Sequence, residues 1–296
     1  MTASAALKPR TPAPMVEGEF LFTEDDFRKI AAMMHGEAGI ALHETKATLV
    51  YSRLAKRLRA LGLSNFQDYC ALVAGPDGLD ERQKMLAALT TNVTRFFREP
   101  HHFEHLRDKV LPPLLAAAKS GGKVRLWSAA CSSGQEPYSA AMTILSLAPD
   151  AANLDIKILA TDIDPNVVAD ARTGIYAESL LTGIPDDYRR RWTTPLAARP
   201  GSVQIADEAR ALITFNELNL IGDWPMKRRF DAIFCRNVAI YFDDETQARL
   251  WSRFAPLLPR GGRLYIGHSE RIAGPAAACF EPDGITTYRL ARELAR

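Results

Sequence analysis

Short apolar runs alternate with helical segments along the second half of the chain, from Lys123 onwards. This rhythm is typical of a doubly wound parallel α/β sheet whose strands are connected through helices. The predicted strands are residues 124–128, 156–161, 212–216, 231–236 and 263–267. Two more apolar segments, 279–280 and 286–290, flank the turn-forming residues 281–284 and predict a final hairpin at the sheet edge.

The first half of the chain has the periodicity of helices instead. From Thr23 to about Lys119 the apolar residues recur at helical spacing, with no convincing strand. Thr23 has an acceptor side chain three residues later, which is a helix-start signal. The glycine pair Gly121-Gly122 separates the two patterns. We therefore predict an all-helical N-terminal domain over 20–120 and an α/β domain over 121–296.

Two segments depart from these patterns. Residues 1–19 are rich in proline and small residues and are predicted to be a disordered tail. Between Gly174 and about Ala211, prolines and a glycine interrupt the alternation of strands and helices, while 202–206 alternates like an exposed strand. We therefore predict a small antiparallel β insert on the sheet, at about 175–210.

Length and composition bound the class of protein. The chain has 296 residues, of which 47% are hydrophobic and 24% charged, as in an ordinary soluble globular protein. The formal net charge of +2 gives no sign of a nucleic-acid-binding protein. No apolar run approaches the roughly 20 residues that span a bilayer, so no membrane insertion is expected.

The compartment follows from the N-terminus and the cysteines. Residues 1–10 have no apolar core before a cleavage site, so no secretory signal is expected. The cysteines are scattered and form no C-x-x-C pair: Cys70, Cys131, Cys235 and Cys279. Isolated cysteines in a chain of this length are typical of reduced thiols, and a cytoplasmic location is expected.

Residues 124–164 carry the most informative motif. A strand over 124–127 opens into the small-residue turn 128–134, a helix follows, and a second strand ends at Asp162. In such a βαβ unit the turn lets backbone approach a nucleoside, and the carboxylate accepts hydrogen bonds from ribose hydroxyls. The turn has one glycine, Gly134, where a dinucleotide fingerprint has three. The motif therefore favours a nucleoside without phosphates, such as S-adenosylmethionine.

Polar side chains gather where the predicted strands end, at the edge where open α/β sheets bind their ligands. They belong to Glu136, Asp162, Asn219, Arg236, Asn237 and Tyr241, and Ala130 lies beside them in the turn after the first strand. Asp162 has the alternative role of a helix cap, and Glu136 that of a first-turn acid that offsets the helix dipole. Tyr241 has the alternative role of packing with Phe242 as an aromatic lid.

A second polar cluster lies in residues 90–100, before a helix predicted to start near Pro100. One interpretation is a lid that places hydroxyl, amide and guanidinium groups over the cofactor, and the other is a capping loop anchored by its phenylalanines. His101 and His105 follow at the i, i+4 spacing that can bind a metal. No further ligand in the sequence completes such a site, so no metal is expected.

A third cluster is a basic helix over residues 46–61. Its apolar stripe is flanked by basic residues, and no acidic residue occurs from Lys46 to Asn65. The basic residues of interest are Arg53, Lys56, Arg57 and Arg59. Two roles remain open, a solvated face or a docking face for an acidic helix or for phosphates.

Several segments, taken together and in order, resemble the CheR family of chemotaxis receptor methyltransferases over most of the chain. They are TNVTRFFRE (91–99), SGQEPYS (133–139), ATDID (160–164), FDAIFCRN (230–237) with IYF (240–242), and GHSE (267–270). The resemblance implies an S-adenosylmethionine-dependent protein-glutamate O-methyltransferase that releases S-adenosylhomocysteine. It also implies a helical N-terminal domain and a Rossmann-like methyltransferase domain with a small β insert.

The resemblance also implies site residues and partners. The cofactor contacts that it implies are Asn92, Thr94, Arg98, Glu136, Asp162, Asn219, Leu220, Arg236 and Asn237, to which the strand-end position adds Ala130. The expected partners are the cytoplasmic helices of chemoreceptors, docked on the basic helix, while the insert is a candidate site for a receptor tail peptide.

A glutamate acceptor simplifies the expected chemistry. Its ordinary pKa of ~4.3 makes it an anionic nucleophile at neutral pH, so no general base is required. Arg98 or Tyr241 is expected to orient the acceptor carboxylate. Two alternatives are a nucleic-acid methyltransferase, for which no Asp-Pro-Pro-Tyr-like motif occurs, and a scaffold that senses S-adenosylmethionine without turnover.

Overall fold

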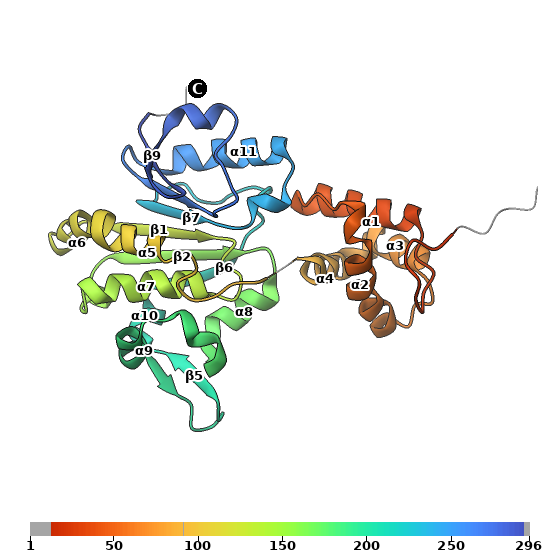
Figure 1. Ribbon diagram of the computed structural model, residues 1–296, viewed down its shortest axis with the longest axis horizontal. Helices are drawn as coiled ribbons and strands as arrows, with labels where there is room; N and C mark the ends of the chain where they lie inside the picture. Colours follow the sequence, from red (N-terminus) through yellow and green to blue (C-terminus); the bar gives the residue numbers. More distant parts are fainter. Residues whose placement is uncertain (1–12, 91, 293–296) are drawn as a thin grey trace, which may run out of the picture. The chain divides into compact units, whose positions relative to one another are not determined.

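The computed structural model describes residues 13–90 and 92–292, which fall into two compact units, Met1–Leu89 and Thr90–Arg296 (Figure 1). The division comes after Leu89 and not at the glycine pair that the sequence favoured. Helices α5 (His101–His105) and α6 (Leu111–Lys119) belong to the second unit, because their buried apolar side chains share one core with the sheet.

The first unit is helical, as predicted. Its helices are α1 (Glu24–Ala38), α2 (Ala47–Leu61), α3 (Phe66–Ala74) and α4 (Leu79–Leu89). Thr23 caps α1 in a reciprocal capping box with Asp26, which confirms the helix start. The rings of Phe22 and Phe66 lie 4.4 Å apart in the centre of the unit.

The segment before α1 is ordered where the structure describes it, in contrast to the predicted tail. The Met15 N–H donates to the Phe22 carbonyl at 2.7 Å, and Glu19 pairs with Arg59 at 2.7 Å. Burial of the Phe20 side chain explains this order, since it anchors the segment on the helices. Residues 1–12 of the predicted tail lie outside the described residues.

The second unit is built on a seven-stranded sheet of order β6-β2-β1-β7-β8-β10-β9 (Figure 1). The strands are β1 (Val124–Ala129), β2 (Ile156–Asp162), β6 (Ile213–Glu217), β7 (Ala232–Cys235), β8 (Arg263–Ile266), β9 (Phe280–Gly284) and β10 (Thr287–Leu290). The five strands predicted from apolar runs are all present and parallel, and the final hairpin is antiparallel at the edge.

The strand order predicts a ligand site at the carboxyl end of β1. From β1 the chain moves to β2 and β6 on one side, then returns to β7 on the other. Ligands of open α/β sheets bind where the order reverses in this way. Helices α7 (Gln135–Leu147) and α11 (Asp244–Phe254) cover opposite faces (Figure 1). Adjacent strand residues point to opposite faces of a sheet. The Ser128 hydroxyl donates a hydrogen bond to Glu136 of α7, whereas the Trp127 ring packs against Phe254 of α11.

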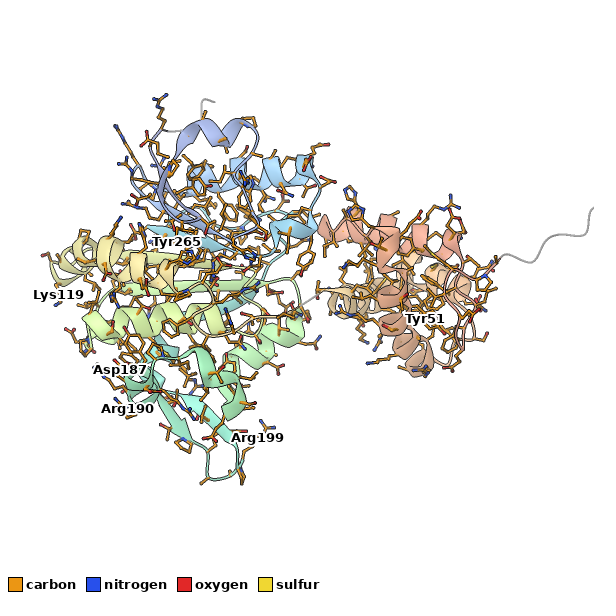
Figure 2. The ribbon with its side chains drawn as sticks, viewed as in Figure 1. Tyr51, Lys119, Asp187, Arg190, Arg199 and Tyr265 are labelled. Atoms are coloured by element: carbon orange, nitrogen blue, oxygen red, sulfur yellow. The ribbon has the colours of Figure 1, made fainter. Side chains whose placement is uncertain are left out.

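The predicted insert is confirmed as a separate antiparallel sheet of order β3-β5-β4. Its elements are β3 (Ile175–Ala177), α9 (Asp186–Trp192), β4 (Thr193–Pro195) and β5 (Ser202–Ile205), and it is preceded by α8 (Pro165–Thr173) and followed by α10 (Asp207–Ala211). Arg190 and Arg199 are exposed on the insert (Figure 2). Among the described residues, no helix is both long and apolar enough to cross a bilayer.

Candidate active site

The turn after β1 is strained and closely packed. Ala130 and Ser132 have φ values of 60° and 50°, and each such residue costs about 1–3 kcal/mol. Gly134 has φ 92°, and a Cβ there would lie 2.8 Å from the Ala171 Cβ, so glycine is required. The Ser132 N–H of this turn donates to the Asp162 carboxylate at 2.7 Å.

Asp162 is a buried carboxylate at the end of β2, next to this turn. Its oxygens accept the N–H groups of Ser132 and Asp164 at 2.7 and 3.0 Å. Burial raises the pKa of Asp162, and these two hydrogen bonds oppose the rise. The cap of α8 is Asp164, which accepts the Asn166 N–H at 2.9 Å. Asp162 is therefore not needed as a helix cap, and it remains an acceptor beside the strained turn.

Glu136 and Arg236 form a buried ion pair across the site. Glu136 accepts the Ser128 hydroxyl at 2.7 Å and the Arg236 Nη1 at 2.9 Å. Burial raises the pKa of Glu136 even though the positive charge of Arg236 lowers it. The side chain of Arg236 is only 2% exposed. Glu136 is thus neither a solvated first-turn acid nor isolated, because its charge is tied to the end of β7.

Glu99 connects the 92–99 loop to the same ion pair. Its Oε2 lies 3.4 Å from the Arg236 Nη2 and 3.7 Å from the His102 Nδ1. Burial alone would raise the pKa of Glu99, but the positive charge of Arg236 and a hydrogen bond from the Asn237 side chain hold it below its ordinary value. Burial, with Arg236 and His101, lowers the pKa of His102 to about 3, so this imidazole is neutral at physiological pH.

The loop also has apolar anchors, so its two interpretations are compatible. Phe96 is fully buried, and the Phe97 N–H donates to the Ser139 hydroxyl at 2.9 Å. Asn92 reaches the end of β2, where its Nδ2 donates to the Asp164 Oδ2 at 3.0 Å. The phenylalanines fix the loop, while Asn92 and Glu99 reach residues at the strand ends.

Glu270 holds the loop after β7. Its carboxylate accepts the N–H groups of Asn237, Val238, Ala239 and Gly267. Asn237 has φ 59°, and a Cβ at Gly267 would lie 2.5 Å from its Nδ2. Glu99 and Glu270 are not among the site residues predicted from the sequence. Each is nevertheless the last residue of a segment that carries the family resemblance, 91–99 and 267–270 respectively.

The remaining predicted residues are placed around this edge. Arg98 is partly buried and its Nη1 donates to the Val93 carbonyl at 2.9 Å. Tyr241 ends the 3-10 turn Ala239–Tyr241 after β7 and is partly exposed, as is Thr94. Leu220 is buried in the segment that follows β6, and its neighbour Asn219 accepts the Ile221 N–H at 3.1 Å. Ala130 lies in the strained turn. Cofactor contact by these residues stays a prediction.

The predicted docking residues belong to the first unit and have unequal roles. Arg57 is held by Glu81 through two hydrogen bonds of 2.8 and 2.6 Å, which join α2 to α4. Arg59 pairs with Glu19, and the Arg53 Nη1 donates to the Ala88 carbonyl at 3.1 Å. Lys56 is exposed. Arg57 is therefore tied to α4, and docking by these residues stays a prediction.

His101 and His105, whose i, i+4 spacing can bind a metal, contact different groups. His105 contacts the Asp283 carboxylate at 3.2 Å and the Tyr265 hydroxyl at 3.1 Å. His101 and His102 lie instead near Glu99, with potential ligand atoms within 4.8 Å of one another. The guanidinium of Arg236 already faces this carboxylate at 3.4 Å, and its positive charge opposes a metal cation there.

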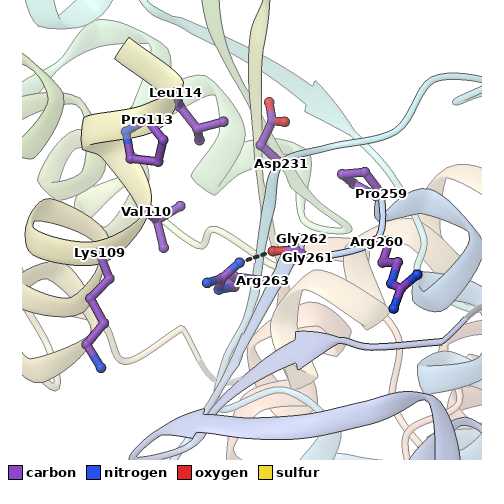
Figure 3. Close-up of a pocket in the computed structure, with 10 residues that line it drawn as sticks. All are labelled: Lys109, Val110, Pro113, Leu114, Asp231, Pro259, Arg260, Gly261, Gly262 and Arg263. Carbon is purple, nitrogen blue, oxygen red and sulfur yellow. Dashed lines mark hydrogen bonds between the residues drawn. The ribbon is translucent and has the colours of Figure 1, made fainter. Parts of the chain in front are cut away.

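A cavity of about 230 Å³ lies at the opposite edge of the sheet (Figure 3). Asp231 and Arg263, at the amino ends of β7 and β8, line it together with Lys109 and Arg260. The Arg263 Nη1 donates to the Gly261 carbonyl (Figure 3). Because ligands of open α/β sheets bind at the carboxyl edge, we do not assign the nucleoside to this cavity.

The chain is similar to known proteins over nearly its whole length. Residues 25–90 match "CheR methyltransferase, all-alpha domain" and residues 92–288 match "CheR methyltransferase, SAM binding domain". The chain is 59% identical to a probable chemotaxis protein methyltransferase of Rhizobium etli, over 87% of this chain and 96% of that protein. It is 40% identical to the chemotaxis protein methyltransferase of Escherichia coli, over 90% of this chain and 91% of that protein.

Proposed function

The chain belongs to the CheR family of S-adenosylmethionine-binding methyltransferases, and from this premise we propose that it esterifies glutamate side chains on chemoreceptors. The single observation that carries the proposal is Asp162, a buried acceptor beside a turn with no large side chain. This arrangement fits a ribose. The turn residues 128–134 include no basic side chain that would hold a pyrophosphate. The receptor's methylated helices would be cytoplasmic, and so would the enzyme.

The chain's own residues would do five tasks. Asp162 would accept the ribose hydroxyls, and Asn219 and Leu220 would line the nucleoside. The Glu136–Arg236 pair would fix the carboxyl end of β7, and Asn92 and Thr94 would close the site from the loop. S-adenosylmethionine supplies an electrophilic methyl group on a positively charged sulfonium. Arg98 or Tyr241 would orient the acceptor carboxylate, which needs no general base because it is already ionised.

A transfer assay tests this function. With methyl-labelled S-adenosylmethionine and a chemoreceptor cytoplasmic fragment, we expect label on glutamate side chains that mild base releases as methanol. DNA and RNA should remain unlabelled. Label on nucleic acid, or cofactor binding with no transfer to the fragment, would contradict the proposal. Arg98→Ala should reduce turnover, while Arg95→Ala, at an exposed arginine of the same loop, is the matched control.

Docking on the basic helix is a separate proposal. An exposed cation such as Lys56 would steer an acidic receptor helix and raise the association rate more than the affinity. Lys56→Glu should raise the KM for the receptor fragment about three- to tenfold at low salt, and the effect should shrink as salt rises. Lys119→Glu, at the exposed end of α6 (Figure 2), is the control. A KM that is unchanged by Lys56→Glu at low salt would remove this helix from the docking surface.

The insert is the proposed site for a receptor tail peptide. Its strand β4 lies at the edge of the small sheet, and an extended peptide can pair with an exposed edge strand. The nearby Arg190 and Arg199 would favour an acidic peptide. Fluorescence anisotropy with labelled receptor tail peptides tests this, and binding that survives Arg190→Glu with Arg199→Glu would contradict it.

A further inference from the structure

The segment after β6 is fixed beside the proposed nucleoside site. The Leu218 N–H donates to the Asp162 carbonyl at 2.9 Å, which joins this segment to the end of β2. Within it, the Asn219 side chain accepts the Ile221 N–H at 3.1 Å, and the Gly222 N–H donates to the Asn219 carbonyl at 3.2 Å. We call residues 218–224 the nucleoside loop, because it contains Asn219 and Leu220.

Arg253, in the last turn of α11, binds the carbonyls of this loop. Its Nη1 donates to the Leu220 carbonyl at 2.7 Å and its Nη2 to the Gly222 carbonyl at 2.5 Å. The Trp224 Nε1 donates to the same Leu220 carbonyl at 3.2 Å. Both acceptor positions of that oxygen are therefore used, and the peptide plane after Leu220 is held in one orientation.

The same guanidinium lies over the Trp224 ring, 3.9 Å from its centre. Trp224 in turn packs edge-on against Trp127 of β1, with ring centres 5.1 Å apart. Burial lowers the pKa of Arg253. Its hydrogen bonds go to carbonyl oxygens, so this partly buried arginine holds the loop backbone and connects the loop to the core of the sheet.

We propose that Arg253 is a positioning residue for the nucleoside subsite and acts only through the nucleoside loop. The inference rests on the proposed S-adenosylmethionine site. Arg253 binds the backbone carbonyls of the loop. It therefore holds Leu220 in the position that contacts the nucleoside before the cofactor binds. A loop that is already ordered loses less conformational entropy on binding, and the gain appears as cofactor affinity.

Calorimetric titration with S-adenosylhomocysteine tests this. Arg253→Met should raise its Kd roughly tenfold or more, because two charge-assisted hydrogen bonds are lost. Arg253→Lys should recover part of the affinity. The kcat at saturating cofactor and the KM for the receptor fragment should stay within about twofold, since the acceptor side is untouched. The control is Arg249→Met, one turn earlier on α11, where the exposed side chain reaches only Thr246 among the described residues.

Equal affinity in Arg253→Met and Arg249→Met would overturn the inference, as would a loss confined to kcat. If Arg253→Met fails to fold, Trp224→Phe decides, because it keeps the ring and removes one donor to the Leu220 carbonyl. A Trp224→Phe protein with wild-type melting temperature and wild-type affinity would then overturn it. Weaker binding of S-adenosylhomocysteine by Arg253→Met, with no methyl transfer by the wild type, would support the positioning role of Arg253 and refute the proposed function.

Discussion

Replacement of Arg236 by methionine is expected to destabilise the second unit by about 3–5 kcal/mol and to abolish measurable cofactor binding. The guanidinium is the positive partner of two carboxylates, Glu136 at 2.9 Å and Glu99 at 3.4 Å, in a site where its own side chain is 2% exposed. Removing it leaves Glu136 as a buried charge, held by the Ser128 hydroxyl. Urea denaturation followed by circular dichroism, with calorimetric titration of S-adenosylhomocysteine, measures both effects.

A second substitution separates charge from packing in this network. In the double variant Arg236→Met with Glu136→Gln, most of the lost stability should return, because the unpaired buried charge is removed. Cofactor affinity should not return with it, because the double variant still lacks the ion pair that fixes the carboxyl end of β7. A single Arg236→Met variant as stable as the wild type would show that the ion pair does not hold the site.

Asp162→Asn is expected to weaken S-adenosylhomocysteine binding roughly 10- to 100-fold. The carboxylate accepts two backbone N–H groups and keeps further acceptor capacity, whereas an amide has one acceptor oxygen and turns an NH₂ group towards one of those donors. Asp155→Asn, just before the other end of β2, is the matched control, because Asp155 pairs with Arg125 at the opposite edge. Equal affinity in the two variants would contradict the assignment.

Ionisation of Asp162 is expected to make the affinity for S-adenosylhomocysteine depend on pH. Burial raises the pKa of Asp162 above that of an exposed aspartate. Since ribose hydroxyls are bound by the ionised form, affinity should be constant above this raised pKa and fall as the pH drops through it. The fall should disappear in Asp162→Asn, which has no proton to gain.

The local parts of the fold could be predicted because they depend on local pattern. Apolar runs located all five parallel strands, and the βαβ unit at 124–164 accounts for the parallel pairing of β1 with β2. The position of Asp162 could be predicted for the same reason, because a residue that ends a parallel strand lies at the carboxyl edge of the sheet. The boundary between the units could not, because α6 has an ordinary helical sequence and only its packing against the sheet assigns it.

Long-range charge pairs account for the rest. Arg236 and Glu136 are 100 residues apart, and Arg57 and Glu81 are 24 apart, so no spacing rule joins them. The sequence therefore offers Arg53, Lys56, Arg57 and Arg59 as docking candidates, while in the structure Arg57 pairs with Glu81 of α4 and Lys56 is exposed. Glu270 is similar, because its four backbone partners come together only after β7 and β8 have paired.

The most direct measurement is a crystal structure of this protein with S-adenosylhomocysteine bound. The ribose hydroxyls should lie within hydrogen-bonding distance of the Asp162 carboxylate, with the adenine against Leu220 and the nucleoside loop unmoved. The sulfur should face Arg98 of the 92–99 loop and Tyr241 of the turn after β7. A ligand seated in the cavity lined by Lys109, Asp231 and Arg263, or bound at the carboxyl edge without contact to Asp162, would contradict the account.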